Sequence, residues 1–162
     1  QAISLSQRHG FSQWLGSATL HLGAALCGLG QLAVGIATLE AALAAWRQAG
    51  AGLLVPYHTG RLALAKLRAN DSAAALELFD SAVAHARLTG EHLYLAELYR
   101  LRATCRLVRG EAKELSAQDL DRAIALAETL GQTVFGHRAM HDKLALDQSL
   151  AMSQETRELL NA

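Results

Sequence analysis

The chain has 162 residues, a length that suits one domain with a sizeable hydrophobic core. Its 15 basic and 15 acidic residues give a formal net charge of zero, which offers no electrostatic basis for binding nucleic acid or an anionic membrane. Alanine and leucine supply 63 of the 162 residues (32 and 31), aromatic residues make up 5% and proline occurs once, so the composition argues against a β-sheet and predicts an all-α protein.

The first long segment, Phe11 to Leu39, contains no Asp, Glu, Lys or Arg and is long enough to span a bilayer. It is interrupted, however, by Gly28-Leu29-Gly30-Gln31, which has the composition of a turn. We therefore predict a buried hairpin with helices at about 11–29 and 32–49, and we interpret residues 1–9 as the tail of a preceding helix.

The rest of the chain predicts further helices of similar length. Pro56 is expected in the first turn of its helix, or at a kink. Ser116 is a candidate N-cap after a longer connection at 110–115, and Ser153 is a candidate N-cap of a short last helix. The expected helices span about 53–69, 72–89, 91–109, 116–130 and 132–148.

The strongest signal is an internal repeat of about 40 residues. Segments 39–50, 79–90 and 120–131 each begin with a large apolar residue, carry an alanine three positions later and end in glycine. The alanine lies on the same helix face as the large residue and lets a neighbouring helix approach closely. A second helix precedes each segment, with small residues in register at Gly23, Ala63 and Ala103.

Each unit is therefore a hairpin of a first helix (helix A) and a second helix (helix B), followed by glycine. Such a hairpin cannot bury its apolar face alone, and stacked hairpins form an α-solenoid with a concave and a convex side. We predict a single domain over 1–162, because no linker-like composition separates the units. Its repeats are expected at about 11–50, 51–90 and 91–131, with a partial one at 132–162.

This pattern resembles the tetratricopeptide repeat (TPR), although the period exceeds the usual 34 residues. Segments 39–50, 55–57 and 96–103 look like the repeat region of large bacterial signalling proteins that carry a signal-transduction ATPase module, often with an adenylate cyclase or DNA-binding domain. The resemblance implies a regulatory scaffold. The phosphate-binding motif G-x-x-x-x-G-K-[ST] of the ATPase is absent from this chain.

Cys27 and Cys105 do not form a C-x-x-C pair, and we expect both to be buried, reduced thiols. No basic segment followed by an apolar run is present at the start, so we predict a cytoplasmic protein without a signal peptide.

Two groups of side chains raise the question of chemistry. His137 and His141 lie one helical turn apart and could share a metal, but no third ligand is evident and Arg138 lies between them, so structural or solvated histidines are favoured. Arg102, Arg106 and Arg109 form a stripe that could bind phosphate, but a solvated face or an ion-pair network between repeats is favoured. Trp14 and Trp46 are expected to pack between helices.

The most specific functional prediction concerns the concave face, which helix A lines. Tyr57, Glu97 and Arg100 offer an aromatic face, an acceptor and a planar donor that suit a peptide or a small polar ligand. From the register of the small residues, Leu20 and Ala24 should also face the groove. The predicted binding residues are His21, Tyr57, Arg61, Leu64, Glu97, Arg100 and Thr104.

The favoured function is a non-catalytic interaction scaffold that binds a peptide, a partner domain or an effector, without a cofactor. Contact with nucleic acid or membrane is not expected. The alternatives are a self-association module, since a cut solenoid exposes apolar ends, and a metal-binding domain that uses His137 and His141.

Overall fold

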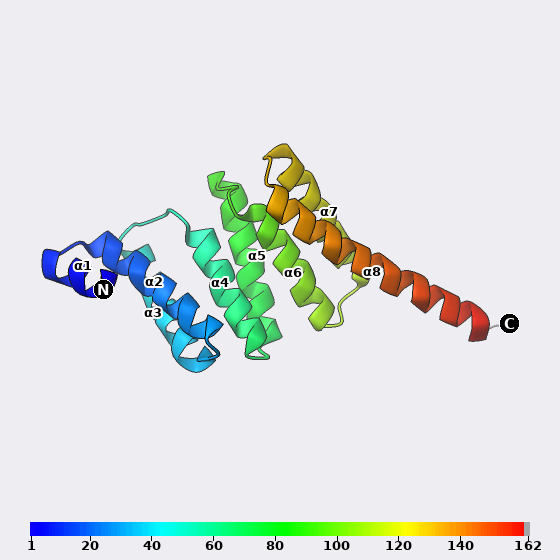
Figure 1. Cartoon of the computed structure of the whole chain (residues 1–162), viewed down its shortest axis with the longest axis horizontal. Coiled ribbons are helices and arrows are strands. Elements are labelled where there is room, and N and C mark those ends of the chain that lie inside the picture. The colour runs from blue at the N-terminus through cyan, green and yellow to red at the C-terminus, as the bar shows by residue number, and fades with distance from the viewer. Residues whose placement is uncertain (161–162) are drawn as a thin grey trace. The chain divides into compact units, whose positions relative to one another are not determined.

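A computed structural model describes the backbone of residues 1–160 and the side chains of residues 1–149. Within this part of the chain every regular element is an α-helix, as the composition predicts (Figure 1). The helices are α1 (Ala2–His9), α2 (Ser12–Gly28), α3 (Leu32–Gln48), α4 (Val55–Arg68), α5 (Ser72–Thr89), α6 (Leu95–Val108), α7 (Lys113–Thr129) and α8 (Thr133–Leu160).

The 40-residue repeat is visible in the burial of individual positions. Val55, Pro56 and His58 of α4 are buried, and so are Leu95, Ala96 and Leu98 at the same places in α6. The same residues of each turn therefore face the core in both helices. Pairs α2 and α3, α4 and α5, and α6 and α7 are the predicted hairpins.

The turns repeat with the same register. Helix B ends at Gly50, Gly90 and Gly131, and all three glycines adopt positive φ values of 64–71°. The turn inside each hairpin uses Gly30, Asn70 or Gly110, again with positive φ. Because a side chain disfavours this left-handed conformation, glycine or asparagine is required where the chain reverses.

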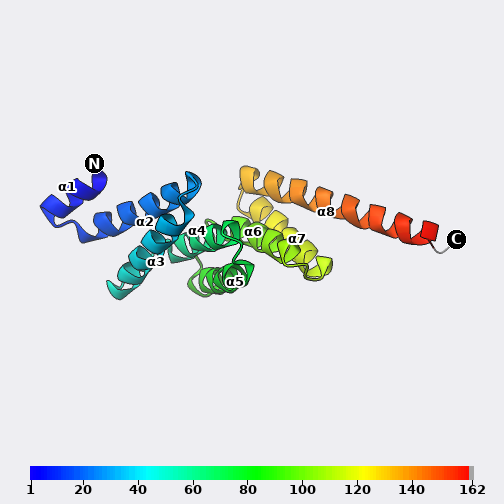
Figure 2. The ribbon, with the colours of Figure 1, turned by 90° about the horizontal axis from the view of Figure 1, so that it is seen from below.

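The packing divides the chain into two compact units, the first spanning Gln1–Glu91 and the second beginning at His92. In the first unit α2 packs on both α3 and α4, α4 packs on α5, and α1 packs on α2 (Figure 2). The core of this unit contains Leu20, Leu39, Leu43 and Leu62 together with buried Cys27. Helices α2 and α3 approach most closely at Gly23 and Gly35, where an added Cβ would meet backbone atoms of the opposite helix.

In the second unit α6 packs on α7 and α8, and α7 packs on α8. Leu95, Leu98, Cys105 and Leu120 are buried here. The contact of α6 with both following helices repeats the contact of α2 with α3 and α4. A helix A is therefore seated on its own helix B and on the next helix A in each unit.

The helix boundaries correct several predictions. Helices α4 and α6 begin at Val55 and Leu95, two to four residues later than expected, and Pro56 is in the first turn of α4. Helix α7 begins at Lys113, so Ser116 is not an N-cap; its buried hydroxyl donates a hydrogen bond of 3.1 Å to the Ala103 carbonyl oxygen. This bond satisfies the hydroxyl inside the hairpin and leaves it no capping role.

Two further predictions concern helix continuity. Helix α8 passes through Ser153 without a break, so the separate last helix is wrong: no Gly or Pro lies between Gly136 and Leu160 to end the helix. The charge-free segment at 11–39 is the predicted hairpin of α2 and α3. Among the helices of the described residues, none combines the length and the apolar character needed to cross a bilayer.

Candidate functional site

The seven predicted binding residues all lie on first helices of hairpins: one on α2, three on α4 and three on α6. The structure brings them together in two groups, one in each unit. We call Glu97, Arg100, Arg138 and Asp142 the α6–α8 ion cluster, and we call His21, Tyr57 and His58 the α2–α4 aromatic cluster.

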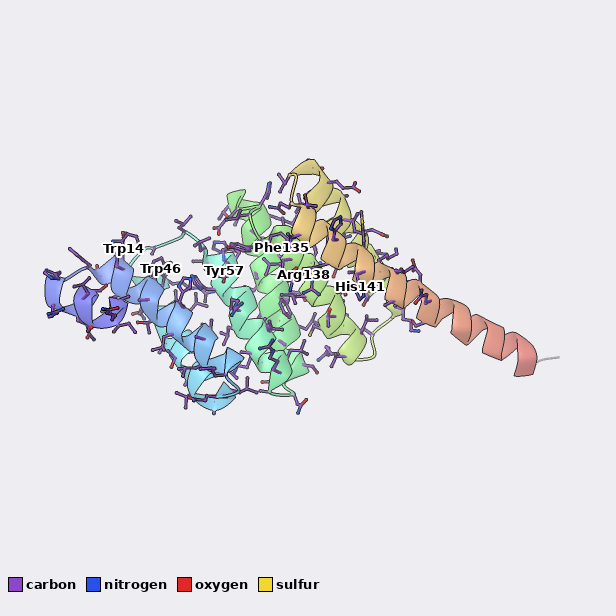
Figure 3. All side chains as sticks on the ribbon, in the orientation of Figure 1. Trp14, Trp46, Tyr57, Phe135, Arg138 and His141 are labelled. Carbon is purple, nitrogen blue, oxygen red and sulfur yellow. The ribbon has the colours of Figure 1, made fainter. Side chains whose placement is uncertain are left out.

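In the α6–α8 ion cluster, Arg100 binds carboxylates on two helices. Its Nε and Nη2 donate to the two Glu97 carboxylate oxygens, both at 2.8 Å, and its Nη1 donates to Asp142 Oδ2 at 2.7 Å. Glu97 also accepts a hydrogen bond of 3.0 Å from Arg138 Nη1. Figure 3 labels Arg138 on α8. Two cations and two carboxylates therefore form one bridge between α6 and α8.

The ion cluster is held firmly. The side chains of Glu97 and Arg100 are only 15% and 14% exposed, so their charges are weakly screened by water. The hydrogen bonds from Arg100 to Glu97 raise the pKa of the guanidinium above its usual value, more than burial lowers it. Thr104 closes the group by donating to the Arg100 carbonyl oxygen at 3.2 Å. The outer members are accessible, since Arg138 is 55% exposed.

The α2–α4 aromatic cluster is centred on a residue that the sequence analysis did not select. His58 is 2% exposed, and its ring lies edge-on to His21, with centroids 5.4 Å apart, and to Tyr57 at 4.9 Å. Burial, with smaller effects of His21 and Arg61, lowers the pKa of His58 to about 4. His58 is therefore neutral at neutral pH. Its place matches the buried Leu98, a register signal that could have identified it.

The remaining predicted residues surround this aromatic cluster. Arg61 and Leu64 are half-buried on α4, and His21 is exposed on α2, where its Nδ1 lies 2.8 Å from the Ser17 carbonyl oxygen. Leu20 and Ala24, which were expected to face the groove, are buried in the core of the first unit. That expectation was wrong, because these positions of α2 face α3 and α4.

The arginine stripe belongs to an ion-pair network, as favoured, but the network lies inside one hairpin and not between repeats. Arg102 Nε and Nη2 donate to the two oxygens of Asp119 at 2.8 and 2.6 Å, and Asp119 is fully buried. Arg106 and Arg122 reach the same carboxylate at 3.5 and 3.3 Å. Asp119 was missed because nothing in a single sequence marks this carboxylate as buried.

The metal hypothesis receives no third ligand. His137 and His141 are exposed on α8, and the nearest acceptor printed for His141 is Asp142 Oδ1 at 3.4 Å from Nδ1. Within residues 1–149, no three His, Cys, Asp or Glu side chains gather as a metal site would require.

The two tryptophans differ. Trp46 packs against the core beside Gly16, and its Nε1 donates to the Leu53 carbonyl oxygen at 3.2 Å, as the packing prediction expects. Trp14 is 71% exposed, so its assignment to a packed interior was wrong (Figure 3). It lines an apolar groove between α1 and α2 instead.

Comparison with known proteins supports the fold. No family model matches the chain. The chain is 32% identical over 136 residues to an uncharacterized protein of Rhizobium meliloti (strain 1021); the match covers 84% of this chain and 13% of that protein.

Two solved structures of a Podosopora anserina putative kinesin light chain with nearly identical TPR-like repeats superpose on 98% of the chain. Their TM-scores are 0.72 and 0.70 at 18% identity, and the match covers 78% and 79% of those chains. The conclusion from the hairpin register and from these structures is that the chain has a TPR-like helical-repeat fold.

Proposed function

We propose that this chain is a non-catalytic interaction segment of a longer bacterial signalling protein. Its first helices would bind a peptide, or another domain of the same polypeptide, in the cytoplasm. The fold supports this proposal because stacked helical hairpins present long binding surfaces on their first helices. The matched bacterial protein is far longer than the matched segment, which agrees with a role as one part of a larger chain.

The observation that carries the proposal is the α6–α8 ion cluster. Its two carboxylates hold Arg100 and Arg138 in defined orientations, so the arginine donors do not need to be ordered when a partner binds. A guanidinium presents its donors in a rigid fork that suits carboxylate or carbonyl acceptors. The cluster carries no net charge, which favours a polypeptide with both donors and acceptors over a polyanion.

The chemistry of the described side chains agrees with binding and not with catalysis. Glu97, Arg100 and Asp142 are hydrogen-bonded to one another, and buried Asp119 is held by arginines. None of these groups is paired with a nucleophile as an acid or base would be. We therefore propose no reaction and no cofactor for this chain.

The test is isothermal titration of the purified chain with the purified remaining domains of its full-length protein. We expect Arg138→Ala and Glu97→Ala to weaken binding at least about tenfold, the effect of losing one charge-assisted hydrogen bond. Lys143→Ala is the matched control: Lys143 is also on α8 and forms an ion pair of 2.8 Å with exposed Asp121, outside the cluster. Equal affinity of all three variants and wild type, or no binding by wild type, would refute the proposal.

A further inference from the structure

The two units show what a helix A normally covers. Helix α2 is seated on α3 and α4, and α6 is seated on α7 and α8. Each seat is formed by a helix B and the helix A that follows it. The structure therefore contains two filled examples of the same helix-on-two-helices contact.

Helices α1 and α2 form a third seat of this kind. Ala2 and Ile3 of α1 are in register with Ala42 and Leu43 of α3, and α1 ends at Gly10 with the left-handed φ of Gly50. Helix α1 is therefore equivalent to the last turns of a helix B, and α2 is the helix A that follows it. No helix of the described residues packs on this pair in the way that α2 packs on α3 and α4.

The seat is an open, apolar and uncharged groove of about 800 Å³, which we call the α1–α2 groove. Phe11, Trp14 and Leu22 are between 43% and 71% exposed along it. An exposed apolar surface of this kind is unfavourable in water and typically marks a contact. Its lining, which contains no Asp, Glu, Lys or Arg, is Gln1, Ala2, Ile3, Leu5, Ser6, Phe11, Trp14, Ser17, Ala18, His21, Leu22 and Ala25.

Helix α8 has the complementary property. It follows helix B of the third hairpin and is a helix A by its contacts with α6 and α7. One side of α8, buried through Gly136, Ala139 and Leu146, meets these helices, and another side is exposed. Helical spacing places five exposed residues on that second side, again without an Asp, Glu, Lys or Arg: Val134, His137, Met140, His141 and Leu144.

We propose that the α1–α2 groove of one copy receives the exposed face of α8 from a second copy, so that the chain associates head to tail. The α8 face, as a helix A, would take in the groove the place that α2 takes on α3 and α4. Both surfaces are uncharged at neutral pH with neutral histidines, so no ionised side chain on either surface has to lose water on contact. This also gives a role to His137 and His141 as part of a contact face.

Such a contact is heterologous, because different surfaces of the two copies meet. Each associated pair therefore retains one free groove and one free α8 face, and growth does not stop at a dimer unless a ring closes. The average mass should consequently rise steadily with concentration and not level off at two copies.

The test uses the chain of 162 residues and measures mass by light scattering and sedimentation up to about 1 mM, a concentration that detects weak specific contacts. Leu22→Glu places a charge in the groove, and Leu144→Glu places one on the α8 face. Leu88→Glu is the control, because Leu88 is 87% exposed on α5 and belongs to neither surface. Circular dichroism verifies that each variant is folded.

We expect wild type and Leu88→Glu to form a concentration-dependent series of oligomers, and each of the other variants to be monomeric by itself. An equimolar mixture of Leu22→Glu and Leu144→Glu should form a dimer and nothing larger, because one intact groove and one intact α8 face remain between them. The emission of Trp14 should shift to shorter wavelength as wild type associates.

A monomeric wild type would overturn the proposal and leave the groove to a different helix. A mass that levels off at two copies, or a mixture of the two variants that forms no dimer, would overturn it as well. None of these variants changes the α6–α8 ion cluster, so the outcome is independent of the peptide-binding proposal.

Discussion

The buried pair Arg102–Asp119 offers a test that the repeat itself designs. Arg102 of α6 is in register with Leu62 of α4, and Asp119 of α7 with Leu78 of α5. The second hairpin thus has two leucines where the third has an ion pair. Replacing Asp119 alone with leucine leaves the Arg102 guanidinium, whose side chain is 10% exposed, without its carboxylate. The expected loss of unfolding free energy is about 3–5 kcal/mol.

The double variant Arg102→Leu/Asp119→Leu restores the arrangement of the second hairpin. We expect its stability to lie within about 1 kcal/mol of wild type or above it, since a packed apolar pair often equals a buried ion pair. The two substitutions should therefore be strongly non-additive, with a coupling of at least about 2 kcal/mol.

The assay has to report on the second unit. Both tryptophans lie in the first unit, so their fluorescence does not follow α6 and α7. Hydrogen exchange of peptides from Leu95–Val108 and Lys113–Thr129, measured by mass spectrometry, gives the local opening free energy directly. A loss below about 1 kcal/mol for Asp119→Leu would refute this reasoning, as would a double variant no more stable than that single variant.

Three further predictions concern the first unit and its turns, and all three are measured by urea unfolding. Gly35→Ala should cost about 1–3 kcal/mol, because the new Cβ would lie 2.8 Å from the Cys27 backbone nitrogen, whereas Gly28→Ala, with open space around it, should be neutral or stabilising; equal effects would contradict the close approach of α2 and α3. The pKa of His58 is about 4 when folded against an ordinary 6.5, so the unfolded state takes up the proton first and stability falls by up to about 3 kcal/mol as the pH drops from 6.5 to 4; His58→Phe should flatten this slope, and an unchanged slope would assign it to other groups. Asn70→Ala should cost about 1 kcal/mol at a φ of 61°, and Asn70→Gly should not; equal stability of the two would show that the turn relaxes.

Most of the fold was predictable because it depends on local spacing. The small residues at 40-residue intervals and the glycines after helix B indicate the hairpins, and the structure confirms them at Gly50, Gly90 and Gly131. Errors arose where a local signal was ambiguous. Ser116 has the chemistry of an N-cap, but its hydroxyl bonds to Ala103 in the neighbouring helix, which local sequence does not reveal.

The binding surface was only partly predictable. Glu97 and Arg100 are one turn apart, so their contact follows from helix geometry. Arg138 and Asp142 are about 40 residues away in sequence, and only the packing of α8 on α6 brings them to the same cluster. The exposure of Trp14 was missed for a related reason, since composition alone does not tell which helix covers a side chain.

The amino-acid sequence by itself determined the helical class, the hairpin register and the places where the chain reverses, because these depend on residues within a few turns of one another. The tertiary structure alone decided which side chains became partners: Asp119 with three arginines, His58 with His21, and Glu97 with Arg138. The physical reason is that burial and pairing energies are set by what lies across the interface between helices, and residues distant along the chain meet there only after the hairpins pack.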